Sequence, residues 1–219
     1  MMNVELNGKV AIITLDDGKA NAMSPAFSRA VLDGLERAKA EAQAVLMVGR
    51  PGRFSAGFDL QVIAQGGEAR THMVELGVKM LYSLFTHPQP VVMACTGHAL
   101  AGGAFILLTG DTRIGTKGDF KIGLNEVAIG MSLPDWGIAL AQNRLSRRHI
   151  TAATIQARIY DPEGAVDAGY LDEVCEADAL LETALARAHA LAELPQANYA
   201  NMKTLMRRDA IEQIQQSMN

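Results

Sequence analysis

Short apolar runs alternate with an amphipathic segment at the start of the chain, and this order limits the possible folds more than any other feature. Val10–Leu15 and Ala44–Val48 are apolar runs bounded by turn residues, which is typical of buried strands. Between them, residues 25–41 repeat apolar side chains at helical spacing. Ser24 and Pro25 suit the cap and the first turn of that helix. The order strand, helix, strand therefore predicts an α/β fold.

The rest of the chain continues this alternation and then becomes mainly helical. Apolar spacing predicts a helix over 70–86, and Ala104–Leu108 is predicted to be a buried helix because glycines precede and follow it. The further expected strands are 91–95, 111–116, 119–122 and 171–175, and the further expected helices are 136–146, 147–157, 163–168, 178–193 and 197–217.

Charge and composition exclude several classes of function. The 20 basic and 24 acidic residues give a net charge of −4, whereas nucleic-acid-binding proteins normally carry a basic surface. Two cysteines are too few for a disulfide framework or a zinc site, and the five histidines show no metal-ligand spacing. No apolar stretch approaches the roughly 20 residues that span a bilayer, and no signal peptide is visible. We expect a cytoplasmic protein without a metal, a nucleic-acid partner or a membrane span.

Two glycine-containing loops each follow an expected strand and lead toward a helix. They are Arg53–Leu60 (Arg-Phe-Ser-Ala-Gly-Phe-Asp-Leu) and Gly97–Ala104 (Gly-His-Ala-Leu-Ala-Gly-Gly-Ala). Helix N-termini leave N–H groups unpaired, and glycine lets a ligand approach the backbone closely. Two such termini facing one another could donate two hydrogen bonds to one developing oxyanion. The alternative is a pair of ordinary strand-to-helix turns. Neither loop has the pattern of a Walker or a dinucleotide-binding loop.

Two carboxylates in the following segment are candidates for acid–base chemistry. Glu126 stands among apolar residues, which is unusual for a carboxylate unless it is paired or functional. Burial would raise its pKa toward the range that suits proton transfer at neutral pH; the alternative is a surface glutamate that begins a helix. Asp135 follows nine residues later and is either a second acid or the N-cap of the helix that contains Trp136.

Three motifs, in this order and spacing, resemble the crotonase (enoyl-CoA hydratase/isomerase) superfamily. They are Ser-Ala-Gly-Phe-Asp-Leu at 55–60, Gly-x-Ala-x-Ala-Gly-Gly at 97–103 and Gly-Leu-Asn-Glu-Val-x-x-Gly at 123–130. The resemblance implies a crotonase-like ββα spiral with trailing C-terminal helices, divided into a core of 1–176 and a short helical region of 177–219. It also implies acyl-CoA thioester substrates, no cofactor other than the coenzyme A of the substrate, and a homotrimer or a dimer of trimers.

The same resemblance assigns roles to individual residues. The backbone N–H groups of Phe58 and Gly102 would form the oxyanion hole, and Glu126 would be the catalytic acid and base, with Asp135 as a possible second acid. Lys19 and Arg53 are candidates for phosphate contacts, or else solvated surface charges. The residues expected to line the substrate channel are Lys19, Ala20, Ala22, Ser55, Ala56, Gly57, Asp59, Leu60, Gly103 and Phe105.

The residue at position 105 separates two reactions of the superfamily. Its hydratases activate water between two glutamates, and the first of these positions is Phe105 here. One carboxylate suffices to move a double bond, because it can take a proton from C2 and return it to C4. The chain is most similar to mitochondrial-type Δ3,Δ2-enoyl-CoA isomerases, which implies an isomerase. The alternatives are a hydratase, hydrolase or dehalogenase that uses Asp135, and a non-catalytic thioester-binding protein.

Overall fold

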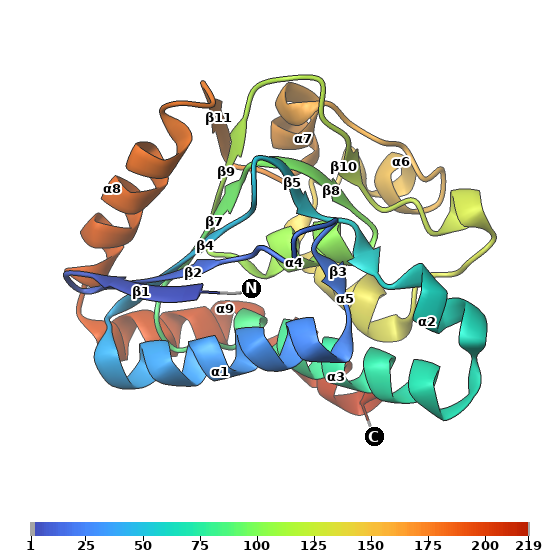
Figure 1. Ribbon diagram of the computed structural model, residues 1–219, viewed down its shortest axis with the longest axis horizontal. Coiled ribbons are helices and arrows are strands. Elements are labelled where there is room, and N and C mark those ends of the chain that lie inside the picture. The colour runs from blue at the N-terminus through green and yellow to red at the C-terminus, as the bar shows by residue number, and fades with distance from the viewer. Residues whose placement is uncertain (1–2, 219) are drawn as a thin grey trace.

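The computed structural model describes residues 3–218, and its centre is a six-stranded sheet (Figure 1). The strand order is β1-β2-β4-β7-β9-β11, in which β1 runs antiparallel to β2 and the other neighbours pair in parallel. Apolar residues occupy both faces of the central strands, as expected for a parallel sheet covered on both sides. The strands are β1 (Asn3–Asn7), β2 (Val10–Thr14), β4 (Ala44–Val48), β7 (Val91–Cys95), β9 (Thr112–Thr116) and β11 (Glu173–Cys175).

Five short strands form two smaller sheets beside the large one. β5 (Gly52–Ser55), β8 (Gly97–Leu100) and β10 (Ile122–Gly123) form a three-stranded parallel sheet in the order β10-β8-β5. β3 (Ala22–Met23) pairs in parallel with β6 (Gly57–Phe58). Three times in succession along the chain, a strand of the large sheet is followed by a strand of the three-stranded sheet and then by a helix. The repeats are β4-β5-α2, with β6 before the helix, then β7-β8-α4, and finally β9-β10-α5, with η1 before the helix. This repeat confirms the ββα spiral.

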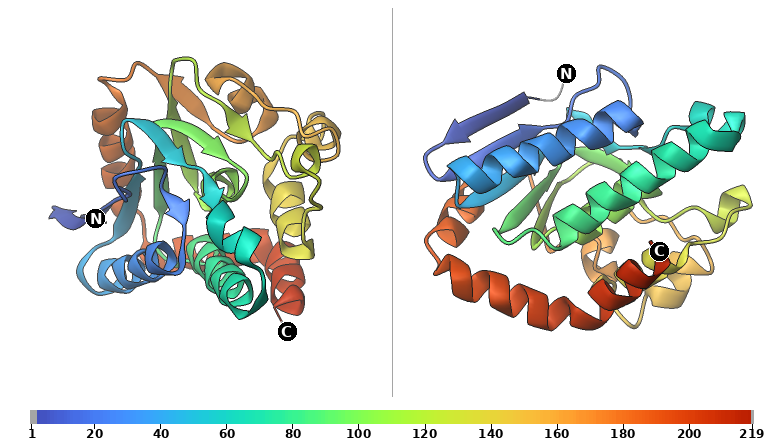
Figure 2. Two further views of the ribbon diagram at one scale, coloured as in Figure 1. Left: turned by 45° about the vertical axis from the view of Figure 1, so that its right-hand side comes forward. Right: turned by 90° about the horizontal axis from the view of Figure 1, so that it is seen from below.

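The helices cover both faces of the large sheet and one end of the molecule. Figure 2 shows α1 and α3 side by side, with α9 beyond α3, while α8 lies on the opposite face of the sheet. Ser24 caps α1 as expected, because its Oγ accepts a hydrogen bond from the Phe27 N–H at 3.2 Å. The helices are α1 (Pro25–Glu41), α2 (Leu60–Gln65), α3 (Gly67–Phe85), α4 (Gly102–Thr109), the 3-10 turn η1 (Val127–Ile129), α5 (Asp135–Arg144), α6 (Ile150–Thr154), α7 (Pro162–Ala168), α8 (Leu180–Ala192) and α9 (Gln196–Ser217).

The structure corrects several expected boundaries. The expected helix 147–157 is the short α6, and the expected strand 119–122 contributes only Ile122 to β10. The helix expected over 70–86 begins at Gly67, and α2 precedes it. With six residues, α2 is too short to show a helical period in the sequence, and none of its residues is buried.

A buried ionic cluster attaches α9 to the rest of the fold. Lys203 and Arg207 of α9 approach the two carboxylate oxygens of Asp111 at 2.5 and 2.8 Å. The Lys203 ammonium also donates to the backbone carbonyls of His87 and Gln89, both at 2.8 Å. Because every charged partner is nearly inaccessible to water, this cluster fixes the position of α9 against the end of the sheet.

Within residues 3–218, no helix is both long and apolar enough to cross a membrane. Clusters of three or more histidine, cysteine, aspartate or glutamate side chains suited to a metal ion are also absent from that range.

Candidate active site

The two glycine-containing loops meet in space. A Cβ atom placed on Gly57 would lie 2.7 Å from the backbone nitrogen of Gly102, and one placed on Gly102 would lie 3.3 Å from the nitrogen of Phe58. Gly57 also has a φ of +82°, which a residue with a side chain rarely adopts. A side chain at either position would collide with the other loop, so the backbones of the two loops approach closely where Phe58 and Gly102 lie.

The second loop holds its shape through a strained residue. Ala101, at the N-cap of α4, has a φ of 49° although it carries a side chain. Its N–H donates to the carbonyl of Gly123 at 3.0 Å, and its carbonyl accepts from the N–H groups of Ala104 and Phe105. Such backbone strain persists only where the surroundings impose it, and it occurs frequently at active sites. The hydrogen bonds of Ala101 impose this conformation and fix the start of α4, where Gly102 lies.

The first loop is held in place by the buried Asn21, which was not among the expected site residues. Asn21 is fully buried, and its side-chain amide donates to the carbonyls of Leu15 and Phe54. Ser55 donates from its hydroxyl to the Asn21 carbonyl at 2.7 Å and accepts from the Gly57 N–H at 3.2 Å. These bonds position the backbone immediately before Phe58.

Glu126 lies in a narrow, mostly apolar cavity of about 200 Å³. The residue is only 8% exposed, and its Oε2 atom has no hydrogen-bond partner among residues 3–218. Burial raises the pKa of this carboxyl above its ordinary value of 4.5. Apart from Glu126, the charged or polar lining residues are Arg70 and Ser132; the apolar lining includes Phe58, Ile63, Val74, Phe105, Met131 and Trp136.

Asp135 does not join Glu126 in this cavity. It lines a separate depression of about 340 Å³ together with Ile138 and residues near the end of α9. The interpretation of Asp135 as an N-cap is also wrong by one residue, because Pro134 occupies the cap position and Asp135 is the first residue of α5. There its negative charge favours the helix through the helix dipole.

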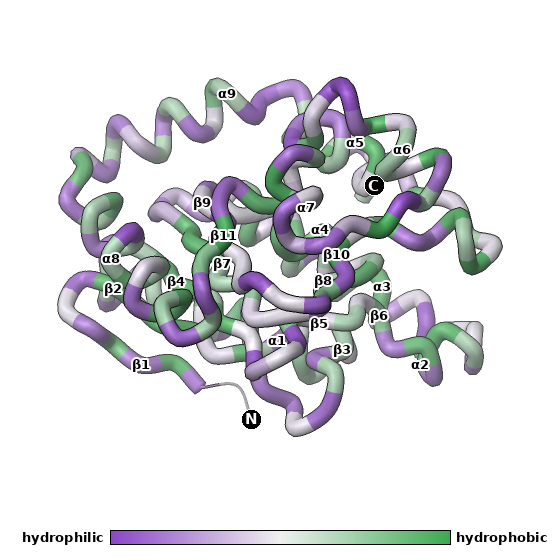
Figure 3. Tube along the Cα trace, turned by 90° about the horizontal axis from the view of Figure 1, so that it is seen from above, coloured by the Kyte–Doolittle hydropathy of each residue, from purple (hydrophilic) through white to green (hydrophobic). Residues whose placement is uncertain are grey.

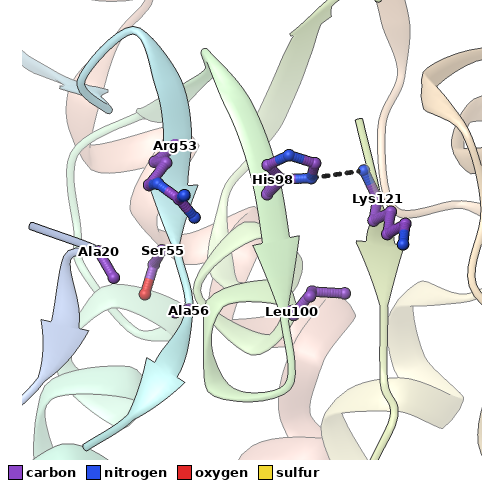
Figure 4. A pocket seen from close by; sticks show the side chains of 7 residues that line it. All are labelled: Ala20, Arg53, Ser55, Ala56, His98, Leu100 and Lys121. Carbon is purple, nitrogen blue, oxygen red and sulfur yellow. Dashed lines mark hydrogen bonds between the residues drawn. The ribbon is translucent and has the colours of Figure 1, made fainter. Parts of the chain in front are cut away.

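A second cavity, of about 190 Å³, lies beside β5 and β8 (Figure 4). Ser55 and Ala56, which precede Phe58, and Leu100, which precedes Gly102, form its inner wall. Its cationic side chains are Arg53 and Lys121. The remaining lining residues are Ala20 and His98.

His98 links two neighbouring strands at the edge of this second cavity. Its Nδ1 atom accepts a hydrogen bond from the Lys121 N–H at 3.0 Å, and its ring meets the edge of Phe120. Because Nδ1 is an acceptor, the proton of the neutral ring is on Nε2. Lys121 was not among the expected site residues, because it lies in a loop and reaches the cavity only through the pairing of β8 with β10.

Some of the remaining expected channel residues line one of the two cavities, and others do not. Phe105 lines the Glu126 cavity, and Ala20, Ser55 and Ala56 line the second cavity, as expected. Gly103 instead packs against the Ser55 carbonyl, which leaves no space for a Cβ atom.

Four further expected channel residues, of which Lys19 is one, lie outside both cavities. Ala22 pairs with Gly57 through β3 and β6. Asp59 caps α2 by accepting from the Gln61 N–H at 2.9 Å. Leu60 is 67% exposed, and neither it nor Lys19 lines either cavity.

Comparison with known proteins agrees with this geometry. The family model described as enoyl-CoA hydratase/isomerase matches residues 5–219. The chain is 28% identical to a putative enoyl-CoA hydratase of Thermus thermophilus, over 88% of this chain and 78% of that protein. It is also 28% identical to the human mitochondrial enoyl-CoA delta isomerase 1, over 91% of this chain and 68% of that protein.

A solved structure gives the same result for the whole fold. The crystal structure of an enoyl-CoA hydratase/isomerase family protein from Pseudomonas syringae superimposes with a TM-score of 0.96. The two proteins are 38% identical, and the superposition covers 99% of this chain and 94% of the other. The motifs, the ββα spiral, the paired glycine loops and these matches agree, and the chain belongs to the enoyl-CoA hydratase/isomerase family.

Proposed function

We propose that this protein is a Δ3→Δ2 enoyl-CoA isomerase in which Glu126 is the single catalytic acid and base. One observation carries the proposal: among the described residues that line the cavity, Glu126 is the one carboxylate, and Phe105 stands where a hydratase would need a second. Addition of water requires one group to activate the water and another to position it or to supply a proton. A phenylalanine ring does neither.

The thioester group of a 3-enoyl-CoA would lie between the two cavities. Its carbonyl oxygen would accept hydrogen bonds from the N–H groups of Phe58 and Gly102, which stabilise negative charge as it develops. Glu126 would remove a proton from C2, and the electrons of that bond would delocalise over a dienolate. Return of the proton to C4 would place the double bond between C2 and C3. Loss of one such oxyanion donor typically raises the barrier by about 3–4 kcal/mol.

The apolar surroundings of Glu126 suit this chemistry. Burial raises the pKa of the carboxyl, which makes the ionised form a stronger base and allows it to hold the proton between the two transfers. The aromatic rings of Phe105 and Trp136 limit the space for water, and exclusion of water protects the dienolate from side reactions.

Part of the coenzyme A portion would occupy the second cavity, and we expect no cofactor other than this part of the substrate. Arg53 and Lys121 present cations at its edge, and cations suit the phosphates of coenzyme A. This substrate class fits the metabolism of unsaturated fatty acids. Figure 3 shows apolar positions alternating with polar ones along α9. Three of its apolar residues, Met202, Leu205 and Met206, are exposed and would suit a contact with another copy of the chain in the homotrimer expected for this family.

Two substrates distinguish this reaction from hydration. The purified protein is offered 3-hexenoyl-CoA and crotonyl-CoA in separate reactions, and the absorbance of the conjugated thioester is followed. The isomerase raises the absorbance with the first substrate and leaves the second unchanged. Loss of absorbance from crotonyl-CoA, without conjugation of 3-hexenoyl-CoA, would establish a hydratase instead.

A further inference from the structure

An apolar groove lies beside the Glu126 cavity and has no role in the proposed function. Its volume is about 440 Å³, and it lies between the segment that follows Glu126 and helices α5 and α6. Among the described residues that line it, none carries a charge; the polar ones have hydroxyl or amide side chains. Its apolar lining residues are Val127, Leu133, Ile138, Ile150 and Ile155.

The wall between this groove and the Glu126 cavity is a single segment of chain. Ser132 borders both spaces, while its neighbours divide between them: Met131 and Pro134 face the cavity, and Leu133 faces the groove. Residues 131–134 have no regular secondary structure, and every residue from 127 to 132 is exposed. The two spaces therefore adjoin across a thin and irregular wall.

Several apolar side chains that line the groove are exposed to solvent. Ile155 is 69% exposed, Val127 47% and Ile138 40%. Clustered exposed apolar residues on a protein surface usually mark a binding site. An uncharged surface that adjoins a substrate cavity suits a flexible alkyl chain, because burial of methylene groups needs no polar partner.

We propose that this groove binds the distal alkyl part of a long-chain acyl-CoA, which leaves the Glu126 cavity across Ser132. The proposal rests on the proposed function for the identity of the thioester, and it adds the substrate class: long-chain rather than short-chain 3-enoyl thioesters. Ser132 marks the point at which the chain crosses, and Ile155 contacts its far end.

Binding of saturated thioesters tests this proposal without any need for turnover. Hexanoyl-CoA and dodecanoyl-CoA are titrated into the protein by calorimetry. Each buried methylene contributes about 0.8 kcal/mol, or about fourfold in affinity. If about three of the additional methylenes are buried, dodecanoyl-CoA binds about 60-fold more tightly. Equal affinities for the two thioesters would overturn the proposal.

A pair of surface variants locates the chain. Ile155→Asp places a charge in the groove and is expected to reduce the affinity for dodecanoyl-CoA about tenfold more than that for hexanoyl-CoA. Leu181→Asp, on α8, is the matched control, because Leu181 is also exposed (51%) and does not line the groove. Equal effects of the two variants, or an equal loss for both thioesters, would contradict the proposal.

Two further outcomes show whether the groove or the reaction has been assigned wrongly. If Ile155→Asp changes the sedimenting mass of the protein and leaves the ratio of the two affinities intact, a second copy of the chain covers the groove and the proposal is wrong. If the chain-length preference is found but neither 3-hexenoyl-CoA nor 3-dodecenoyl-CoA is isomerised, the groove assignment stands and the proposed reaction fails.

Discussion

The ring of Phe105 packs against the ring of Trp136 with their centroids 4.9 Å apart, and both rings line the cavity that contains Glu126. Gly137 leaves space for this arrangement, because a Cβ atom there would lie 2.8 Å from the Phe105 ring. Aromatic surface thus occupies the position from which a second carboxylate could act. Glu126 is consequently a buried carboxylate with no second carboxylate among the described residues that line its cavity.

Replacement of Glu126 by glutamine should abolish isomerisation and preserve binding. The amide has the same shape but cannot take up the C2 proton, and loss of a general base typically costs about 10²–10⁴-fold in rate. Turnover of 3-hexenoyl-CoA and the dissociation constant of hexanoyl-CoA measure the two effects.

Asp135→Asn should retain most of the activity, since Asp135 lines a different depression. An inactive Asp135→Asn variant would contradict the one-carboxylate mechanism.

As the pH is lowered, the rate of isomerisation should begin to fall at a higher pH than it would if the base were a solvent-exposed glutamate. The reaction needs the ionised carboxylate of Glu126, and burial raises the pKa of this group above 4.5. As the pH falls through the raised pKa, the base becomes protonated and the rate declines. The acidic limb of a profile of kcat/KM against pH measures this value in the free protein. A midpoint at or below 4.5 would show that Glu126 is not the titrating group.

A methyl group at Gly57 should damage the oxyanion hole. In Gly57→Ala the new Cβ would meet the Gly102 nitrogen at 2.7 Å, so the two amides would be forced apart. We expect kcat to fall about 10²–10³-fold, as on loss of an oxyanion donor. Gly52→Ala is the matched control, because Gly52 has a similar φ of +77° but no atom within 4 Å of the added Cβ. Equal losses would mean that backbone strain, not the contact with Gly102, causes the effect.

The main strands and helices and the candidate site residues were predictable because their signals are local. Buried strands and amphipathic helices appear as apolar patterns, so β2, β4, β7, α1 and α9 were found close to their true bounds. Glu126 stood out as a carboxylate in an apolar segment, and the two glycine loops stood out by their composition.

The second sheet was not predictable from patterns of this kind. β5, β8 and β10 are two to four residues long and are strands only because they pair with one another across the spiral. The same holds for the bracing by Asn21, whose partners include Phe54, and for the second cavity, to which Lys121 and Arg53 come from separate turns of the spiral.

The free energy of unfolding should contain a contribution from His87 that falls as the solution becomes more acidic. Burial lowers the pKa of His87 to about 4, while the unfolded chain retains a value near 6.5. Between these values the unfolded state binds a proton that the folded state does not, so stability decreases as the pH falls, by up to about 1.4 kcal/mol per pH unit. Denaturant unfolding of His87→Gln should lack this slope. Parallel curves for the two proteins would refute the assignment.

Removal of the Asp111 charge should destabilise the fold more than removal of a surface carboxylate. Asp111→Asn keeps the shape of the side chain but leaves Lys203 and Arg207 buried without a counter-charge, which typically costs about 3–5 kcal/mol. Glu193→Gln is the control, because the Lys9–Glu193 pair is more than half exposed and such pairs contribute about 0–1 kcal/mol. Chemical denaturation measures both. Lys203 and Arg207 hold α9 against the end of the sheet, so Asp111→Asn should also raise the rate of amide hydrogen exchange in α9 more than in the rest of the chain. An equal rise throughout the chain would show that the cluster does not act specifically on that helix.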